Sequence, residues 1–142
     1  MYASTVNWRR WSEGSSQRAI GLSDRRLVRV VGAIDELIAR GITSCSPVNI
    51  NAMNEVSFSL VSIKEVSIVS PQGATLCTSL SIDLGRRHAL TPRIPLAKSN
   101  VAMEILRIGE RKDRVVRFSR AIEPGGASLA VLIPAQLFLP IG

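Results

Sequence analysis

The sequence of 142 residues holds one histidine and two cysteines, and aromatic residues make up 4% of it. So few Cys and His residues cannot supply the four ligands of a structural zinc site, and they exclude a cysteine-rich scaffold. A histidine-based triad could use only His88. No run approaches the roughly 18 to 20 apolar residues that span a bilayer, and Met1 to Arg10 lack the apolar segment of a secretory signal. Three classes of protein remain: a basic binding protein, a structural shell protein, and a small sensory domain whose chemistry is that of its thiols.

The composition, 46% hydrophobic and 20% charged, is that of one ordinary globular domain. The net charge of +7 is regional: residues 1–29 carry +4, residues 30–85 carry −3, residues 86–120 carry +7 and residues 121–142 carry −1. Fifteen of the 18 basic residues are arginine, which favours planar contacts with carboxylates or phosphates. We expect most arginines of the second basic block to line the solvated face of an antiparallel sheet.

The first 22 residues have no periodic pattern and are expected to form a basic extension ahead of one domain over residues 23–142. Within the extension, Trp8-Arg9-Arg10-Trp11 places two aromatic residues around two cations. Such a segment could contact phosphate, lie at a membrane surface, or be a solvated chain end.

A first amphipathic helix is predicted over residues 24–40. Ser23 is a suitable N-cap, Asp24 stands in the first turn, and Gly41 stands where a helix-terminating glycine is common. Between them, apolar residues recur at steps of three and four: Leu27, Val30, Val31, Ile34, Leu37 and Ile38. A second, short helix is predicted from Pro47, with Ser46 as its cap, to Val56 or Ser57.

The rest of the chain predicts an antiparallel sheet, so the expected fold class is α+β. The five predicted strands cover residues 63–69, 75–79, 101–108, 114–122 and 128–139. Pro71-Gln72-Gly73 forms the turn of the first hairpin, and Pro134 predicts an edge position or a bulge for the last strand. Residues 80–100 are expected to wrap over the domain as a loop. In the strand over 114–122, one face carries Val116, Phe118 and Ile122 and the other carries Arg117 and Ser119.

We find no catalytic constellation in the sequence, and we expect no enzyme activity, cofactor or metal. His88 follows Arg87 in the loose segment and is expected to be a solvated loop residue. The carboxylates Asp35, Glu36, Glu110 and Asp113 fall on a helix and in a turn, where ordinary surface charges occur. Gly85 and Gly125-Gly126 lack the spacing of a phosphate-binding loop and are expected to form turns.

The two cysteines are the most informative residues. Cys45 opens the second helix and Cys77 lies late in the first hairpin, and each precedes small hydroxylated or turn-forming residues: Ser46-Pro47 and Thr78-Ser79. A helix N-terminus favours the thiolate form of a nearby cysteine, which makes Cys45 a plausible reactive thiol. If the two are bonded, chain entropy stabilises the fold by roughly 3.7 kcal/mol. The alternative is that both are reduced and buried.

These residues resemble a known family, the CSS-motif sensor domains that precede the EAL domain of membrane-bound bacterial cyclic di-GMP phosphodiesterases. The resemblance covers about residues 34–80, and Cys77-Thr78-Ser79 stands where the family usually has Cys-Ser-Ser. The other matching residues are Leu37, Gly41, Cys45-Ser46-Pro47, Met53, Ser62 to Val69, Pro71-Gln72-Gly73 and Leu76.

The resemblance implies a periplasmic PAS-like (PDC-like) sensor fold with a disulfide between Cys45 and Cys77. It also implies that the redox state of this pair controls a cytoplasmic EAL phosphodiesterase, which the bonded form restrains and the reduced form releases. The implied partners are periplasmic thiol-disulfide oxidoreductases, the membrane and EAL parts of a parent protein, and a second copy of the chain. This sequence contains neither membrane helix nor EAL domain and stops after the fifth predicted strand, before the C-terminal part of the usual sensor. We therefore expect a sensor domain truncated at its C-terminus, which is either an excised or truncated ectodomain or a stand-alone relic.

The competing hypothesis is a basic nucleic-acid-binding or capsid-like structural protein. The Trp8 to Trp11 segment and the Arg86 to Arg120 block would then contact phosphates. We favour the redox sensor, because a basic surface is a generic property whereas the context of the two cysteines is more specific.

Overall fold

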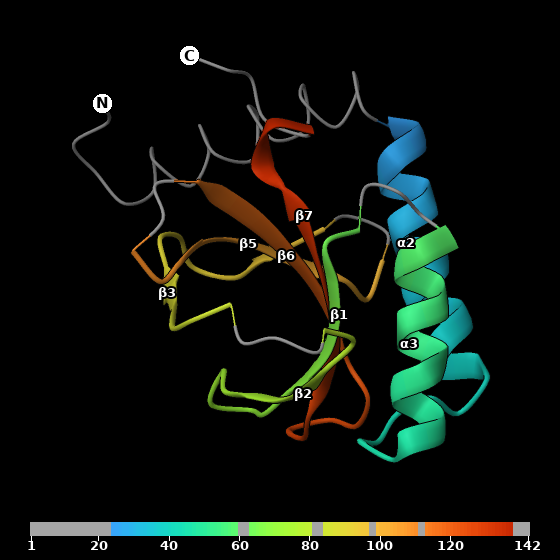
Figure 1. Ribbon diagram of the computed structural model, residues 1–142. Coiled ribbons are helices and arrows are strands. Elements are labelled where there is room, and N and C mark those ends of the chain that lie inside the picture. Colours follow the sequence, from blue (N-terminus) through green and yellow to red (C-terminus); the bar gives the residue numbers. More distant parts are fainter. Residues whose placement is uncertain (1–23, 60–62, 81–83, 97–98, 111–112, 138–142) are drawn as a thin grey trace.

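The computed structural model describes residues 24–59, 63–80, 84–96, 99–110 and 113–137, and shows two helices beside a curled antiparallel sheet (Figure 1). The helices are α2 (Asp24–Ala39) and α3 (Pro47–Ser59). The strands are β1 (Glu65–Val69), β2 (Thr75–Thr78), β3 (Arg87–Ala89), β4 (Ile94–Pro95), β5 (Ala102–Ile108), β6 (Arg114–Ala121) and β7 (Ser128–Pro134), and a 3-10 turn follows at Ala135–Leu137. The α+β class with an antiparallel sheet is therefore confirmed.

The strand order in the sheet is β2-β1-β7-β6-β5-β3, and β4 pairs with β5 beside β3. Strand β7, the last in the sequence, lies between β1 and β6 in the middle of the sheet. The edge position expected from Pro134 is therefore wrong. This proline is the last residue of β7, where a missing N–H interrupts no further pairing, and the strand ends there rather than at residue 139. The bulge lies elsewhere, in β1 between Ile68 and Val69.

The end of α2 and the start of α3 lie where local sequence signals place them. At the end of α2, the N–H of Gly41 donates to Ile38 and that of Ile42 donates to Leu37, at 3.0 Å each. This is a Schellman ending, and it needs the left-handed conformation that Gly41 adopts at φ 78°. Helix α3 begins at Pro47 as predicted but continues to Ser59, two to three residues further than expected. Ser23, the expected cap of α2, and the expected extension over residues 1–22 lie outside the described residues.

The main core lies between the two helices and one face of the sheet. It contains Ile34 and Leu37 of α2, Met53 of α3, and the strand residues Val116 and Phe118, all fully buried. The predicted apolar face of α2 and the Val116 and Phe118 face of β6 are thus confirmed. Burial of these side chains, at roughly 25 cal/mol per Å² of apolar surface, holds the helices on the sheet.

The opposite face of the sheet is concave, because the sheet curls until the β3 edge approaches β1 and β2 (Figure 1). Arg117 and Ser119 lie on this face and are each only 5% exposed. The solvated face expected for them is therefore wrong, since alternation along a strand predicts opposite faces but not which of them the fold covers.

Residues 80–100 were expected to form a loop, and that expectation is wrong in part. This segment contains β3 and β4, which raises the number of strands from the expected five to seven. His88 accordingly lies in β3, opposite Arg107 of β5, and is half-buried rather than in a solvated loop. Three-residue and two-residue strands leave almost no periodic pattern in a sequence, which explains the miss.

Candidate redox site

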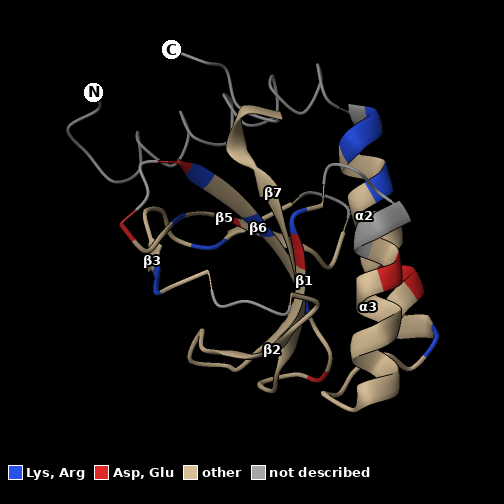
Figure 2. Cartoon of the chain, viewed as in Figure 1, with Lys and Arg blue, Asp and Glu red and all other residues tan. Residues whose placement is uncertain are grey.

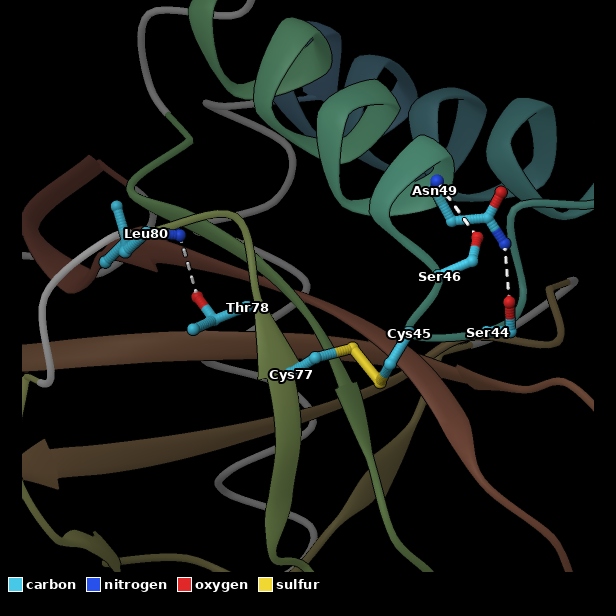
Figure 3. The surroundings of a disulfide bond; sticks show 7 residues. All are labelled: Ser44, Cys45, Ser46, Asn49, Cys77, Thr78 and Leu80. Carbon is cyan, nitrogen blue, oxygen red and sulfur yellow. Dashed lines mark hydrogen bonds between the residues drawn. A yellow bond between two sulfur atoms is a disulfide. The ribbon is translucent and has the colours of Figure 1, made fainter.

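Cys45 lies in the short connection between α2 and α3, directly before the capping residue of α3. The backbone N–H of Asn49 donates to the Ser46 hydroxyl at 3.2 Å, and the Asn49 side-chain amide donates to the Ser44 hydroxyl at 2.8 Å (Figure 3). These bonds, together with the Ile50 N–H to Ser46 carbonyl bond of 2.9 Å, satisfy groups at the start of the helix. The predicted cap at Ser46 and first helical position at Pro47 are confirmed, and they fix the backbone next to Cys45.

Cys77 lies in β2, opposite Ile68 of β1, and packs at the margin of the main core. Its sulfur is joined to that of Cys45, with an S–S distance of 2.05 Å and Cα atoms 5.8 Å apart (Figure 3). This is the pairing that the family resemblance implies. The bond connects the start of α3 to an edge strand across 32 positions of sequence, and it closes the loop that contains α3, β1 and the hairpin turn.

The two residues after Cys77 have structural roles of their own. The Thr78 hydroxyl donates to Glu65 Oε2 at 2.8 Å and accepts the Leu80 N–H at 3.1 Å. The Ser79 hydroxyl accepts the Val66 N–H at 3.0 Å, and the Ser79 N–H donates to the Val66 carbonyl at 2.8 Å. A hydroxyl is therefore used at both positions, which gives a physical reason why threonine can stand at the middle position.

The two sulfur-bearing residues differ in accessibility. Cys45 is exposed, whereas Cys77 is half-buried between β1 and the cavity beside β2. A thiolate from outside attacks a disulfide sulfur that it can reach, so Cys45 presents the accessible side of the bond. The exposed cysteine also stands at the positive end of a 13-residue helix, which favours its thiolate once the bond is open. The site can therefore undergo thiol-disulfide exchange.

A pair of buried charges close to the disulfide was missed in the sequence. Glu65 of β1 is fully buried, and its carboxylate receives both terminal nitrogens of Arg87 of β3, at 2.5 and 2.6 Å. A second buried pair joins Glu104 of β5 to Arg117 of β6, with Nε and Nη2 each 2.7 Å from Oε1. A glutamate in a strand of mostly apolar residues is the signal that could have indicated a partner, because such residues are seldom buried unpaired.

Other candidate residues lie away from this site. Asp35 pairs with Arg120 at 2.5 Å on the exposed surface. Among the described residues, no cluster of three His, Cys, Asp or Glu residues could hold a metal ion, and no helix is long and apolar enough to cross a membrane. The Trp8 to Trp11 segment lies outside the described residues.

The arginines of residues 86–120 divide into two groups. Arg87, Arg117 and Arg120 are engaged with carboxylates, whereas four of the others are exposed: Arg86, Arg93, Arg107 and Arg114. Basic residues are visible on β5, on β6, near β3 and on the first half of α2, while β2 carries no charge (Figure 2). Of the seven arginines of this block that the structure describes, three are therefore engaged with carboxylates and four are exposed.

Comparison with known proteins identifies no similar protein. The chain matches no protein-family model, and searches of curated proteins and of solved structures find no significant match. Its function must be argued from its own residues.

Proposed function

We propose that this chain is a redox-sensing input domain with a PAS-like (PDC-like) fold, placed in the periplasm, whose Cys45–Cys77 disulfide regulates an EAL-type cyclic di-GMP phosphodiesterase in a membrane signalling protein. The observation that carries this proposal is the disulfide itself, which joins the capped start of α3 to β2 with its Cys45 side exposed. Disulfides persist in oxidising compartments, which agrees with the proposed location.

The proposed chemical step is reduction by the dithiol of a periplasmic thiol-disulfide oxidoreductase. Its thiolate attacks the sulfur of the exposed residue Cys45, which forms a mixed disulfide and releases Cys77 as a thiolate that takes up a proton. The second thiol of the oxidoreductase then attacks the first sulfur of the oxidoreductase, the one bonded to Cys45. This step closes the disulfide of the oxidoreductase and releases Cys45. Two electrons pass to this protein, which ends with two thiols, and the oxidoreductase ends with a disulfide.

The mechanical consequence is release of the start of α3 from β2. Within residues 47–56, Ala52 and Met53 of this helix are buried and Val56 packs against the core, so reduction would remove the covalent attachment of the helix start while these contacts remain. The connection from Ala39 to Pro47 is short, so movement of α3 is transmitted to the end of α2. In the proposed parent protein, α2 leads toward the membrane and carries the signal.

Thiol titration tests the proposal most directly. Protein purified from an oxidising compartment should contain no reactive thiol under denaturing conditions and two after reduction. Two free thiols before reduction would refute the redox sensor. Fusing the chain to an EAL domain through membrane helices supplies the activity readout: Cys45→Ser and Cys77→Ser, singly and together, should release phosphodiesterase activity to the level of the reduced protein. Ser44→Ala, next to the bond but not part of it, is the matched control and should leave the restraint intact.

A second candidate function, nucleic-acid binding, is favoured by one observation, the four exposed arginines of residues 86–120. Binding through phosphates falls steeply as salt rises. Retention on immobilised DNA and RNA at low salt, lost at physiological salt and weakened by Arg107→Ala and Arg114→Ala, would support it. No retention at low salt would remove it.

A further inference from the structure

The concave face of the sheet contains a cavity of about 420 Å³ that opens beside the β1–β2 turn. Its lining combines strand residues with the turn after β3. The polar residues of the lining are Gln72, Arg87, Thr91, Arg93, Glu104 and Arg117. Leu106 and Ala89 provide apolar wall. A cavity of this volume falls within the range of small-molecule sites, and its wall is about equally polar and apolar.

Arg117 in the wall of this cavity has an unused hydrogen-bond donor. The residue is 5% exposed, and its Nε and Nη2 are both committed to a single oxygen of Glu104. Its third nitrogen, Nη1, is buried and has no hydrogen-bond partner among the described residues. Buried guanidinium nitrogens are normally paired, because leaving one unpaired forfeits its hydration without a replacement. The unpaired Nη1 of Arg117 can therefore donate a hydrogen bond to an acceptor atom of a ligand.

The charge of the cavity wall also favours an anion. Three arginines and one glutamate line it. Arg87 is neutralised by Glu65 behind the wall and Arg117 by Glu104, so Arg93 contributes one positive charge without an ion-pair partner among the described residues. Arg93 is exposed, which places this charge at the rim. The excess matches a ligand with a single negative charge.

We propose that this cavity binds a short-chain monocarboxylate. The carboxylate would accept hydrogen bonds from the free Arg117 nitrogen and from Arg93, since guanidinium groups match carboxylates in charge and planar geometry. The alkyl part would lie against Leu106 and Ala89. An inorganic oxyanion such as phosphate could use the arginines but not the apolar wall, so the chain should prefer an organic acid. The inference is independent of the redox switch, because it concerns the disulfide-bonded protein at constant redox state.

Thermal unfolding and calorimetry of the oxidised full chain test the site with acetate, butanoate, hexanoate and phosphate as probes. Butanoate or hexanoate should bind saturably and raise Tm by about 8 °C at a hundredfold excess over Kd, and acetate and phosphate should bind more weakly. If no carboxylate binds at millimolar concentrations, or if phosphate binds as well as the best carboxylate, the proposal fails. Thiol titration of the same sample reports separately on the redox proposal.

Two variants locate the binding. Arg93→Ala removes the rim charge from an exposed position and should weaken butanoate binding about tenfold. Arg107→Ala is the matched control, since this exposed arginine of β5 lies outside the cavity lining, and it should leave Kd unchanged. Arg117→Lys keeps a cation opposite Glu104 but removes the free nitrogen, and should abolish binding. Equal affinities in wild type and Arg93→Ala would overturn the site even if Arg117→Lys fails to fold.

Discussion

Helices α2 and α3 lie on the same face of the sheet, and they are attached to it by different means. Helix α2 contacts the central strands β6 and β7 and buries Val30, Ile34 and Leu37 to 2% exposure or less. Helix α3 contacts the edge pair β1 and β2, and within residues 47–56 it buries only Ala52 and Met53. Its start is held to β2 by the disulfide instead. Only one of the two attachments can therefore respond to a reductant.

The apolar contacts that keep the chain folded are distinct from the disulfide, which a reductant can break. Burial of apolar side chains does not depend on redox state, whereas a disulfide bond to an exposed cysteine residue does. A helix whose attachment depends on such a bond can detach while the rest of the core persists, because local opening needs less free energy than global unfolding. Four predictions test this separation, from the largest expected effect to the smallest.

Shortening a core side chain of α2 should have the largest effect. Leu37→Ala should lower the free energy of unfolding by about 4 kcal/mol, because it removes a fully buried side chain and leaves a cavity beside the sheet. Chemical denaturation measures the change. Val28→Ala, on the same helix but 65% exposed, is the control and should alter stability by less than about 0.5 kcal/mol. A loss below about 1 kcal/mol for Leu37→Ala would contradict the proposed role of α2.

Removing the disulfide should come next. Replacing Cys45 and Cys77 together by serine should cost about 3.7 kcal/mol, because the unfolded chain regains the freedom of the closed loop. Hydrogen exchange should show the loss of protection first in α3, with α2 still protected. The double variant should also be insensitive to reductant, which provides the control. Equal loss of protection in both helices would show that the switchable and the permanent parts are not separate.

Removing the cap of α3 should have a smaller effect of the same kind. Ser46→Ala deletes the acceptor of the Asn49 N–H and should destabilise the protein by about 1 kcal/mol. Exchange should rise in the first turn of α3 only, in both redox states. Ser44→Ala, which removes only a side-chain partner of Asn49, is the comparison and should cost less. If the two variants are equal, Ser46 contributes nothing as a cap.

The smallest effect is expected at the exposed ion pair between α2 and the sheet. The side chain of Arg120 is 29% exposed and that of Asp35 is 49% exposed. Arg120→Ala breaks their contact and should lower the free energy of unfolding by about 0.5 kcal/mol. The difference from wild type should vanish at high salt, because exposed charges are screened. Denaturant titrations at low and high ionic strength measure it. A cost that persists at high salt would mean that Arg120 stabilises α2 by packing rather than by charge.

Local signals in the sequence predicted much of the helix side of the molecule. Gly41, Ser46 and Pro47 each predict a helix boundary through backbone chemistry that acts within a few residues. The Pro71-Gln72-Gly73 turn is confirmed in the same way, with the Gly73 N–H donating to Ser70 at 2.9 Å. These features depend on neighbours in the chain, so a single sequence is sufficient to predict them.

The concave side could not be predicted in this way. Glu65 and Arg87 are 22 positions apart, and β3 meets β1 only because the sheet curls. The central place of β7 likewise depends on which strands pair, and alternation in one strand says nothing about its neighbours. For this reason the sequence does not indicate that the fold covers the face of β6 that carries Arg117. The redox pairing could be anticipated only through resemblance to a family, not from the spacing of two cysteines.

Strand β2 presents neighbouring side chains to opposite faces of the sheet. Cys77 is bonded toward α3, and the next residue, Thr78, donates to the Glu65 carboxylate that also holds Arg87 in the cavity wall. Thermodynamic linkage is reciprocal, so any molecule that binds the concave face more tightly in the oxidised protein must make the disulfide harder to reduce, by the same free energy. A four-residue strand can thus couple a covalent equilibrium on one side of the sheet to a binding equilibrium on the other.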